Sequence, residues 1–220
     1  SGQITEEALL TALQKTAHQA QRAGQIIQRI RAFVKKSEPN RALADVHSMV
    51  DEAVELADIE LRRHNVRLTH YVAARLPPVM ADTILIEQVL VNLMKNGAEA
   101  IQMANRLTSG RSVELRVVPK HIEDREVVEF SVQDTGKGLA PEVLERLFEA
   151  FFSTKEEGMG MGLNLCRSIV ESHHGRMQAE NLYNGSEVTG CRFSFWLPLA
   201  KPVDATTNSV ANAQPPRTIA

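Results

Sequence analysis

The first forty residues carry a single apolar stripe. From Leu9 to Val34, apolar or small residues recur at alternating steps of four and three, and polar side chains fill the other positions. This spacing predicts one long helix with a heptad-like seam over residues 1–36. A helix with one narrow apolar face is not stable alone in water, so a partner helix is expected, either from an upstream segment or from a second copy of the chain.

The pattern changes after residues 37–42, which we interpret as a hinge because the residue before Pro39 avoids the helical region. Ser48 with Asp51 has the pattern of a capping box and would open a helix running to about residue 64. Asp82 is a candidate cap for a second, strongly apolar helix, and residues 163–173 predict a third. Residues 201–220 have no periodicity and are rich in Pro, Asn, Thr and Ala, which predicts a disordered tail.

Several runs between residues 43 and 200 have the composition of strands. They are residues 66–72, 79–81, 112–118, 126–133, 176–181 and 191–197. The third and fourth of these runs are joined by a charged loop and predict a hairpin. Helices combined with mostly antiparallel strands indicate an α+β domain, built as a two-layer sandwich and preceded by the long helix.

Composition narrows the choice of partners. With 220 residues and a net charge of −2, the chain has no global field that would draw it to nucleic acid or to an anionic membrane. An anionic ligand must therefore be bound by a local device. No run approaches the roughly 18 apolar residues that span a bilayer, so we expect a cytoplasmic segment without membrane contact, although a longer protein could carry an anchor. Cys166 and Cys191 are predicted to be buried, reduced thiols.

Two asparagines one helical turn apart are the first candidate for chemistry. Asn92 and Asn96 share a helix face, and the neighbouring face is strongly apolar. Asparagine is a poor helix former, so this pair suggests the polar edge of a cleft rather than simple exposure. Amide oxygens are neutral, hard ligands that magnesium accepts when phosphates supply the negative charge.

Three further segments follow within the next seventy residues. Asp134 comes at the end of a strand and is followed by Gly136 and Gly138, which would form a sharp turn with close backbone approach. Taken alone, this segment is better interpreted as an ordinary Asx-type turn. Phe151 and Phe152 are adjacent aromatics that we interpret as core anchors at the start of a mobile lid. Lys155 offers a point charge for a terminal phosphate, although alone it could be a solvated loop residue.

The last segment places glycines at every second position before a helix. Exposed amides at Gly158, Gly160 and Gly162, followed by the positive end of the helix beginning at Leu163, make a phosphate-binding device. The spacing differs from both the dinucleotide fingerprint and the P-loop. A glycine-rich stretch alone could equally be a linker, so its weight comes from the order of all four segments.

In that order, the four segments resemble the N, G1, F and G2 boxes of the nucleotide-binding domain shared by sensor histidine kinases, Hsp90 chaperones, DNA gyrase B and MutL. Residues 88–100 and 147–155 are most similar to histidine kinases of the nitrogen-regulation and oxygen-sensor subclass. The resemblance covers residues 41–200 and implies a Bergerat-type ATP-binding fold over residues 43–200. Gly97 departs from the alanine common in the family.

The resemblance implies a role for each candidate residue. Asp134 would bind the exocyclic amine of adenine, with Gly136 and Gly138 letting the chain pass the base. Asn96, with Asn92 beside it, would hold Mg²⁺ against the phosphates of ATP or ADP. Lys155 would meet the terminal phosphate, and Asn92 and Lys155 would act in the transfer step. The remaining phosphate contacts would come from the lid residues Gly158, Gly160, Met161, Gly162 and Leu163.

The resemblance also implies partners that the sequence does not contain. Residues 17–39 are similar to the second helix of the family's dimerisation and phosphotransfer domain, so the first helix with its target histidine is expected upstream. None of the seven histidines is followed by the acidic residue and proline typical of that target. We therefore expect Mg-ATP binding without self-phosphorylation, a homodimer in the parent kinase, and a response regulator as the final phosphoryl acceptor.

Two other functions remain open at this point. A nucleotide-gated ATPase or chaperone-like module would use the same fold with water as acceptor. The Hsp90-like relatives place a water-activating glutamate one turn before the metal-binding asparagine, and Asn92 occupies that position here, which favours phosphoryl transfer. A non-enzymatic dimerisation module, gated by nucleotide, is the other alternative.

Overall fold

The computed structural model describes residues 13, 16, 39–104, 110–122, 124–155 and 160–200. Leu13 and Thr16, which belong to the predicted long helix, are helical and exposed. The other residues of the segment 1–36, residues 37–38 of the predicted hinge and the predicted tail 201–220 lie outside the described residues. The boundaries of these segments therefore stay predictions.

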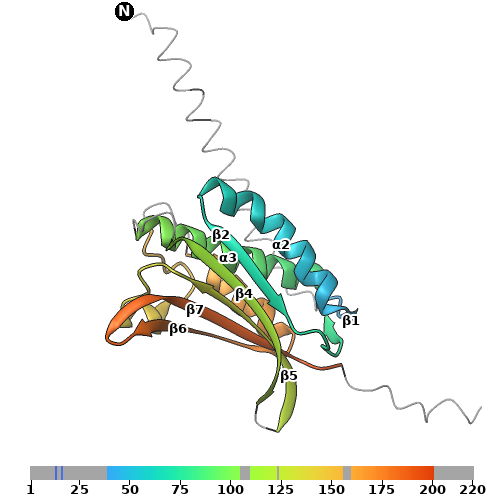
Figure 1. Cartoon of the computed structure of the whole chain (residues 1–220). Coiled ribbons are helices and arrows are strands. Elements are labelled where there is room, and N and C mark those ends of the chain that lie inside the picture. The colour runs from blue at the N-terminus through green and yellow to red at the C-terminus, as the bar shows by residue number, and fades with distance from the viewer. Residues whose placement is uncertain are drawn as a thin grey trace, which may run out of the picture.

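A five-stranded sheet forms one layer of the domain (Figure 1). β2 pairs in parallel with β4, and the other neighbours are antiparallel. The mixed, mostly antiparallel sheet confirms the predicted strand character and the hairpin of β4 with β5. In spatial order the strands are β2 (Arg67–Val72), β4 (Ser112–Ile122), β5 (Arg125–Asp134), β7 (Glu187–Pro198) and β6 (Arg176–Asn184).

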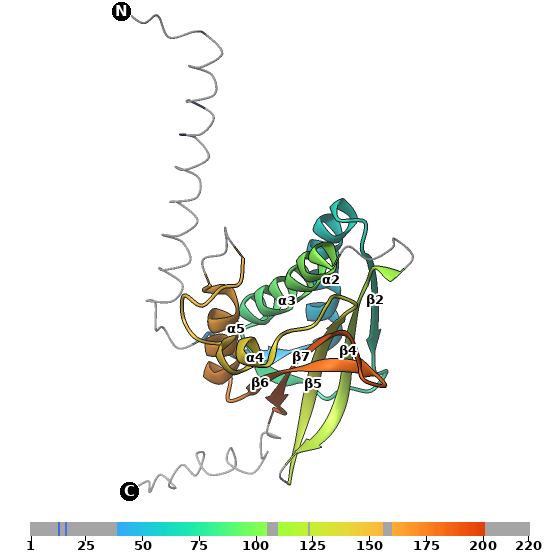
Figure 2. The ribbon, with the colours of Figure 1, turned by 90° about the vertical axis from the view of Figure 1, so that its left-hand side faces the viewer.

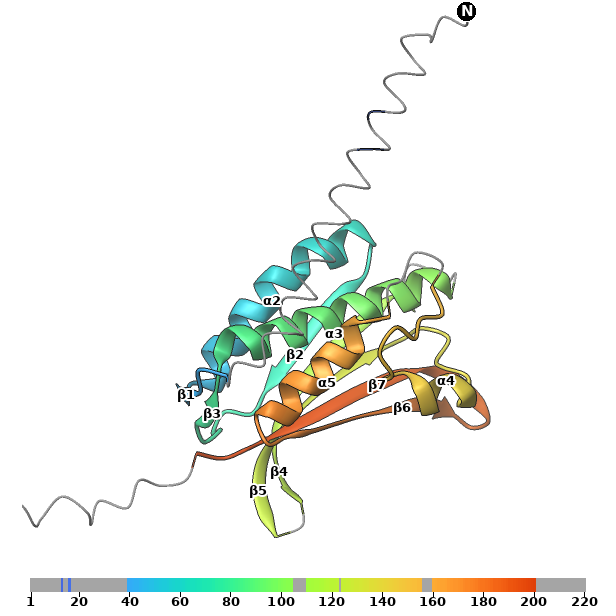
Figure 3. The ribbon, with the colours of Figure 1, turned by 180° about the vertical axis from the view of Figure 1, so that it is seen from behind.

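Three helices cover one face of this sheet, as Figures 2 and 3 show from the side and from behind. They are α2 (Val46–Arg63), α3 (Thr83–Met103) and α5 (Gly162–Ser172). The short helix α4 (Pro141–Arg146) follows β5 and begins with proline in its first turn, as predicted. The arrangement is the two-layer α+β sandwich expected from the sequence.

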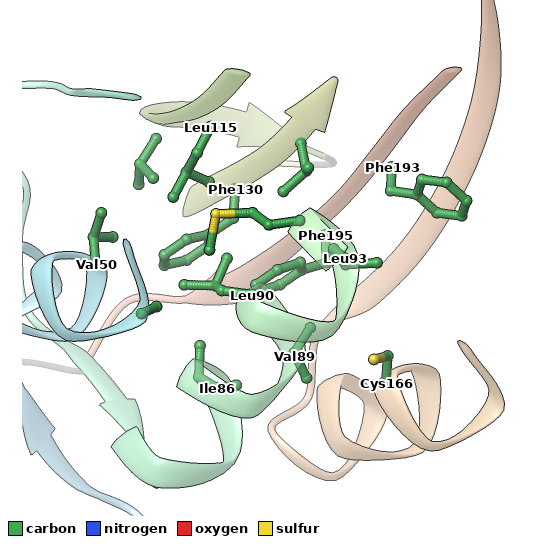
Figure 4. Packing of buried hydrophobic residues seen from close by; sticks show 14 of the residues in the cluster. Val50, Ile86, Val89, Leu90, Leu93, Leu115, Phe130, Cys166, Phe193 and Phe195 are labelled. Atoms are coloured by element: carbon green, nitrogen blue, oxygen red, sulfur yellow. The ribbon is translucent and has the colours of Figure 1, made fainter. Parts of the chain in front are cut away.

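The core lies between α3 and the sheet. Figure 4 shows apolar side chains of α3, among them Leu90 and Leu93, facing aromatic rings of β5 and β7. Phe130 and Phe195 stack with ring centroids 4.8 Å apart and are both buried. Removing one such buried ring typically costs about 3–5 kcal/mol, so this layer fixes α3 relative to the strands that carry the candidate site.

Helix caps fix where α2 and α3 begin. Asp82 accepts a hydrogen bond from the Leu85 N–H at 3.4 Å, as the sequence predicted for α3. The prediction for α2 was wrong by one turn: Asp45, not Ser48, is the N-cap, and its carboxylate accepts from the Ser48 N–H at 2.8 Å. This hydrogen bond lowers the pKa of Asp45 below its usual value. A carboxylate outcompetes a hydroxyl at this position because it is the stronger acceptor.

Two short strands sit beside the helices. β1 (Ala42–Ala44) pairs antiparallel with β3 (Val79–Ala81). Ala42, at the end of the predicted hinge, therefore already belongs to a strand.

Within the described part of the chain, no helix combines the length and the apolar character needed to cross a bilayer.

Candidate functional site

Helix α3 carries both candidate asparagines on the edge of its buried face. Asn92 and Asn96 are half-buried, whereas Leu93, Met94 and Ala98 between and beyond them are buried in the core. The 3.6-residue period separates the two faces and places the two amides one turn apart. The structure therefore has the polar edge that the sequence predicted at this helix.

Asn92 connects α3 to the beginning of α5. Its Nδ2 group donates to the Cys166 Sγ atom at 3.1 Å. A Cβ placed on Gly162 would lie 3.2 Å from the Asn92 side-chain atoms, so the start of α5 packs tightly against this side chain. Burial raises the pKa of the Cys166 thiol to about 12, and the sulfur therefore accepts this bond as a neutral group.

Asn96 lies next to the candidate phosphate lysine. The Lys155 Nζ atom donates to Asn96 Oδ1 at 3.5 Å and forms an ion pair with Glu99 on the next turn of α3. The Lys155 backbone N–H in turn donates to the Ser153 hydroxyl at 3.1 Å. The structure thus brings Lys155 to the asparagine face from 59 residues away along the chain.

Asp134, at the end of β5, approaches the same helix. Its side chain is buried, with 4% exposed, and its Oδ1 accepts from the Gly136 N–H at 2.8 Å. A Cβ on Gly97 would lie 3.2 Å from the Asp134 Cβ, and a Cβ on Gly190 would lie 1.9 Å from the Asp134 carbonyl oxygen. Glycines on α3 and β7 therefore make room for this strand end from both sides.

Two glycines shape the turn after Asp134. A Cβ on Gly136 would lie 3.1 Å from the Ala100 Cβ, so the turn presses against α3. Gly138 has φ +72, a left-handed conformation that favours glycine. The Asn181 side chain then holds the next residue, accepting from the Leu139 N–H at 2.8 Å and donating to the Leu139 carbonyl at 2.7 Å. The predicted sharp turn with close approach is therefore present.

The aromatic pair was interpreted wrongly in part. Phe151 is 76% exposed and has φ +67, so its ring points away from the core and does not anchor the segment. Phe152 is half-buried, and the Arg146 guanidinium lies 4.5 Å from its ring centroid. The anchor is instead one turn earlier, where the Asn164 amide of α5 donates to the Phe148 carbonyl at 2.8 Å.

The glycine-rich segment joins the aromatic segment to α5. Gly160 has φ +64, its carbonyl accepts from the Phe151 N–H at 3.0 Å, and a Cβ there would lie 2.4 Å from the Phe151 carbonyl carbon. α5 begins at Gly162, and its N-cap Met161 supplies no side-chain hydrogen bond. Leu163 lies half-buried in the first turn of that helix, whereas Gly158 lies outside the described residues.

The sequence missed three residues of this region. Glu99, Cys166 and Asn181 each bond to a candidate residue or to its turn. Glu99 could have been found, because it lies one turn beyond Asn96 on the same face of the helix. The other two could not, since their partners are 74 and 42 residues away along the chain.

Two cavities in the described structure lie elsewhere. One of about 300 Å³ is on the sheet face opposite the helices, around Lys120 and Trp196. Another of about 600 Å³ lies between α4, α5 and β6, around Leu144 and Met177. No residue that the sequence assigned to the site lines either cavity.

Comparison with known proteins shows the family of the chain. Residues 81–201 match the family of histidine kinase-, DNA gyrase B- and HSP90-like ATPases, and the chain belongs to this family. It is 44% identical over 169 residues to the C4-dicarboxylate transport sensor protein DctS of Rhodobacter capsulatus, covering 77% of this chain and 25% of that protein. It is 40% identical over 190 residues to the sensor protein FixL of Bradyrhizobium diazoefficiens, covering 86% and 35%.

A solved structure extends the likeness to the fold. Full-length ShkA in complex with AMPPNP matches with a TM-score of 0.68 and 25% identity, over 90% of this chain and 40% of that chain. The chain thus spans between 25% and 40% of the length of these three proteins. The catalytic domain of the histidine kinase ThkA also matches, with a TM-score of 0.57 and 27% identity over 72% of this chain and 95% of that chain, so the domain has the architecture found in histidine kinases.

Proposed function

We propose that residues 43–200 are the ATP-binding catalytic domain of a sensor histidine kinase. It would transfer the γ-phosphate of ATP to a histidine of the parent protein, for relay to an aspartate of a response regulator. One observation carries the proposal: Asn96, Lys155 and the glycine at the start of α5 meet along one face of α3, with Asp134 against the same helix. Four segments far apart in sequence thus form one site.

Asp134 is proposed to select adenine. Its Oδ1 atom is engaged by the Gly136 N–H, which holds the carboxylate in a fixed orientation at 2.8 Å. A carboxylate accepts hydrogen bonds and therefore suits the exocyclic amine of adenine, while the carbonyl of guanine would repel it. Gly136 and Gly138 allow the tight turn after this carboxylate and would let the backbone pass close to the base.

The donor set suits Mg²⁺ bound together with phosphates. Among the described residues, no group of three or more His, Cys, Asp or Glu side chains could hold a metal ion. Mg²⁺ usually keeps several waters and takes one or two protein oxygens plus substrate phosphates, so the amide oxygens of Asn96 and Asn92 are sufficient. When bound, Mg²⁺ would neutralise phosphate charge during transfer.

The Lys155 ammonium group and backbone amides at the start of α5 would bind the phosphates. Lys155 places an ammonium group next to Asn96, and Gly160, Met161, Gly162 and Leu163 lead into the positive end of α5. Binding would hold the γ-phosphate in line with the incoming imidazole. The nitrogen–phosphorus bond then forms as the bond between the γ-phosphorus and the ADP oxygen breaks.

The site favours transfer over hydrolysis. The position of the water-activating glutamate in Hsp90-like relatives is Asn92, whose amide is not a base and already donates to Cys166. Steady-state ATP turnover by the isolated chain should therefore be negligible. Rapid turnover would instead support the ATPase alternative.

This 220-residue chain is proposed not to phosphorylate itself. His173 is buried, with its ring nitrogens bonded to the Ile169 carbonyl and the Asp82 N–H. None of the other histidines has the sequence context of a family acceptor. We further propose a cytoplasmic location, a homodimer through the upstream helices, and contact with a response regulator receiver domain.

Calorimetry with Mg-ADP and Mg-ATP tests the binding site. The wild-type chain should bind both, and Asn96→Ala should bind neither measurably. Gln88→Ala removes an exposed amide from the same helix and should bind as wild type does. A folded wild-type chain that takes up neither nucleotide would overturn the proposal.

Transfer is tested by adding a helical hairpin that contains a histidine followed by an acidic residue. Radiolabelled ATP should label that hairpin with an acid-labile, base-stable phosphoryl group and leave the 220-residue chain unlabelled. Acid-labile label on the chain itself would contradict the absence of an internal acceptor.

A further inference from the structure

We propose that Glu99 is a positioning residue that holds the Lys155 ammonium against Asn96 and must release it when metal-bound nucleotide arrives. The proposal rests on the function proposed above and adds a residue that neither the sequence motifs nor the family resemblance assigned. It makes Lys155 a tethered cation that competes for the position where the metal–phosphate unit is expected.

The geometry of α3 places three polar side chains in one row. Asn92, Asn96 and Glu99 follow one another at steps of four and three residues, so they share a helix face. Lys155 reaches this row from the segment between α4 and α5. Its Nζ atom forms an ion pair with the Glu99 Oε2 atom and lies 3.5 Å from Asn96 Oδ1.

The ion pair is partly shielded from water. The Glu99 side chain is 28% exposed and the Lys155 side chain 32%. Charge attraction at such a site is stronger than between fully exposed groups, because less water screens it. Since the Lys155 N–H is also fixed by the Ser153 hydroxyl, the flexible lysine side chain can move while its backbone stays in place.

Asn96 Oδ1 is the atom proposed to face Mg²⁺, and an ammonium group already donates to it. A lysine ammonium and a metal ion both require oxygen partners and repel each other at this separation. Binding of a metal-bound nucleotide must therefore move Lys155 away from Asn96 and from Glu99. The terminal phosphate offers Lys155 a new anionic partner, and the metal supplies positive charge near Glu99.

This exchange predicts an unusual effect of removing the carboxylate. Glu99→Gln frees Lys155 from its partner and should tighten Mg-ATP binding by up to about fivefold, the range of a partly exposed ion pair. Adenosine, which lacks phosphates, should bind Glu99→Gln and wild type equally. A residue that only supports the fold would not increase affinity when its ion pair is broken.

The companion measurement uses Lys155→Met as a background. Without the lysine there is no cation to release, so Glu99→Gln should leave Mg-ATP affinity unchanged or lower it through the lost attraction between Glu99 and Mg²⁺. Glu99→Asp keeps the charge on a shorter side chain and should lie between wild type and Glu99→Gln. Titration calorimetry of wild type, Glu99→Gln, Lys155→Met and the double variant gives the coupling free energy between Glu99 and Lys155 in nucleotide binding.

The outcomes separate this inference from the function on which it rests. Tighter Mg-ATP binding in Glu99→Gln only when Lys155 is present supports the exchange. No tightening, or equal tightening in both backgrounds, overturns it while leaving the nucleotide site intact. Wild-type protein that binds neither adenosine nor Mg-ATP would instead remove the proposed function itself.

Discussion

The two ends of the candidate site rest on different supports. The proposed adenine end consists of Asp134 at the end of a central strand, which packs closely against Gly97 of α3 and Gly190 of β7. The proposed phosphate end consists of Lys155 and Gly160 on the connection between α4 and α5, beside an exposed Phe151. One end is buried in regular structure, whereas the other lies on irregular backbone held by a few side-chain bonds.

This difference indicates how each end responds to a ligand. Around Asp134, a base would meet side chains that are already oriented by backbone contacts, so binding should cost little rearrangement. Around Lys155, the existing partners Glu99 and Asn96 would be exchanged for phosphate and metal under the proposed function. Variants of the two ends should therefore separate recognition of adenosine from recognition of its phosphates.

After the loss of binding expected for Asn96→Ala, the next largest effect is expected at the proposed adenine end. Asp134→Asn keeps the shape and the acceptor for the Gly136 N–H but removes the charge. It should weaken adenosine and ADP alike by about ten- to hundredfold, the value of a hydrogen bond to a charged group. Asp124→Asn makes the same change in an exposed turn and should have no effect. Equal affinity of wild type and Asp134→Asn in calorimetry would remove Asp134 from the site.

A glycine pair tests the phosphate end. Gly160 and Gly185 have φ values of +64 and +63, but a Cβ clashes with the backbone of Phe151 only at Gly160. Both alanine variants should lose about 1 kcal/mol of stability from the left-handed conformation. Gly160→Ala should in addition weaken ATP about tenfold and leave adenosine unchanged. A matching loss of adenosine affinity would mean that the two ends are not independent.

The C-terminal end of α5 is joined to the start of α3 by His173, and the stability of this contact depends on pH. His173 must be neutral there, because its Nε2 atom accepts from the Asp82 N–H at 3.0 Å and its Nδ1 group donates to the Ile169 carbonyl at 2.8 Å. Burial lowers the pKa of His173 below its ordinary value, with nearby Arg41 and His174 acting in the same direction and Asp82 opposing them. The unfolded chain therefore binds this proton more readily than the folded chain does.

The contribution of neutral His173 to the free energy of unfolding is therefore complete above about pH 6.5, and it is lost as the pH falls below that value. Urea denaturation between pH 5 and 7.5 should show this loss in wild type and a weaker one in His173→Gln, which should also be about 1–2 kcal/mol less stable at neutral pH. His121→Gln changes an exposed histidine and should follow wild type. Parallel pH curves for all three proteins would exclude His173 as the source.

The smallest expected effect concerns the contact between Asn92 of α3 and Cys166 of α5. Cys166→Ala removes the acceptor of the Asn92 amide and should weaken Mg-ATP by about threefold, as expected for loss of a weak neutral hydrogen bond. Cys166→Ser retains an acceptor and should bind more tightly than Cys166→Ala. If both variants bind equally in calorimetry, the sulfur does not orient Asn92.

The sequence predicted the locally determined parts of this structure. α3 was predicted because its apolar period and its Asp82 cap lie within one segment, and the hairpin of β4 with β5 was predicted because its strands are neighbours. The parallel pairing of β2 with β4 was not predictable, since it forms across α3 and depends on the whole sheet.

Within the candidate site, the same distinction holds. Asn92 and Asn96 were proposed from local pattern, and both lie on α3. Asp134 was assigned from the order of the four segments, and the structure brings it from the end of β5 against Gly97 of the same helix. Phe151 was assigned to the core because adjacent aromatics usually pack inside, but its positive φ turns the ring outward. The ion pair of Lys155 with Glu99 joins residues 56 apart, and no spacing rule could reveal it.

Helix α3 combines all of these contacts in one continuous stretch, and this limits how the gene can vary. Each residue added or deleted turns everything beyond it by about 100° around the helix axis. A single-codon insertion between Asn92 and Asn96 would separate the two amides, rotate Gly97 away from Asp134 and expose core side chains at once. Length changes should therefore be tolerated in the turns of this domain, while α3 accepts substitutions only.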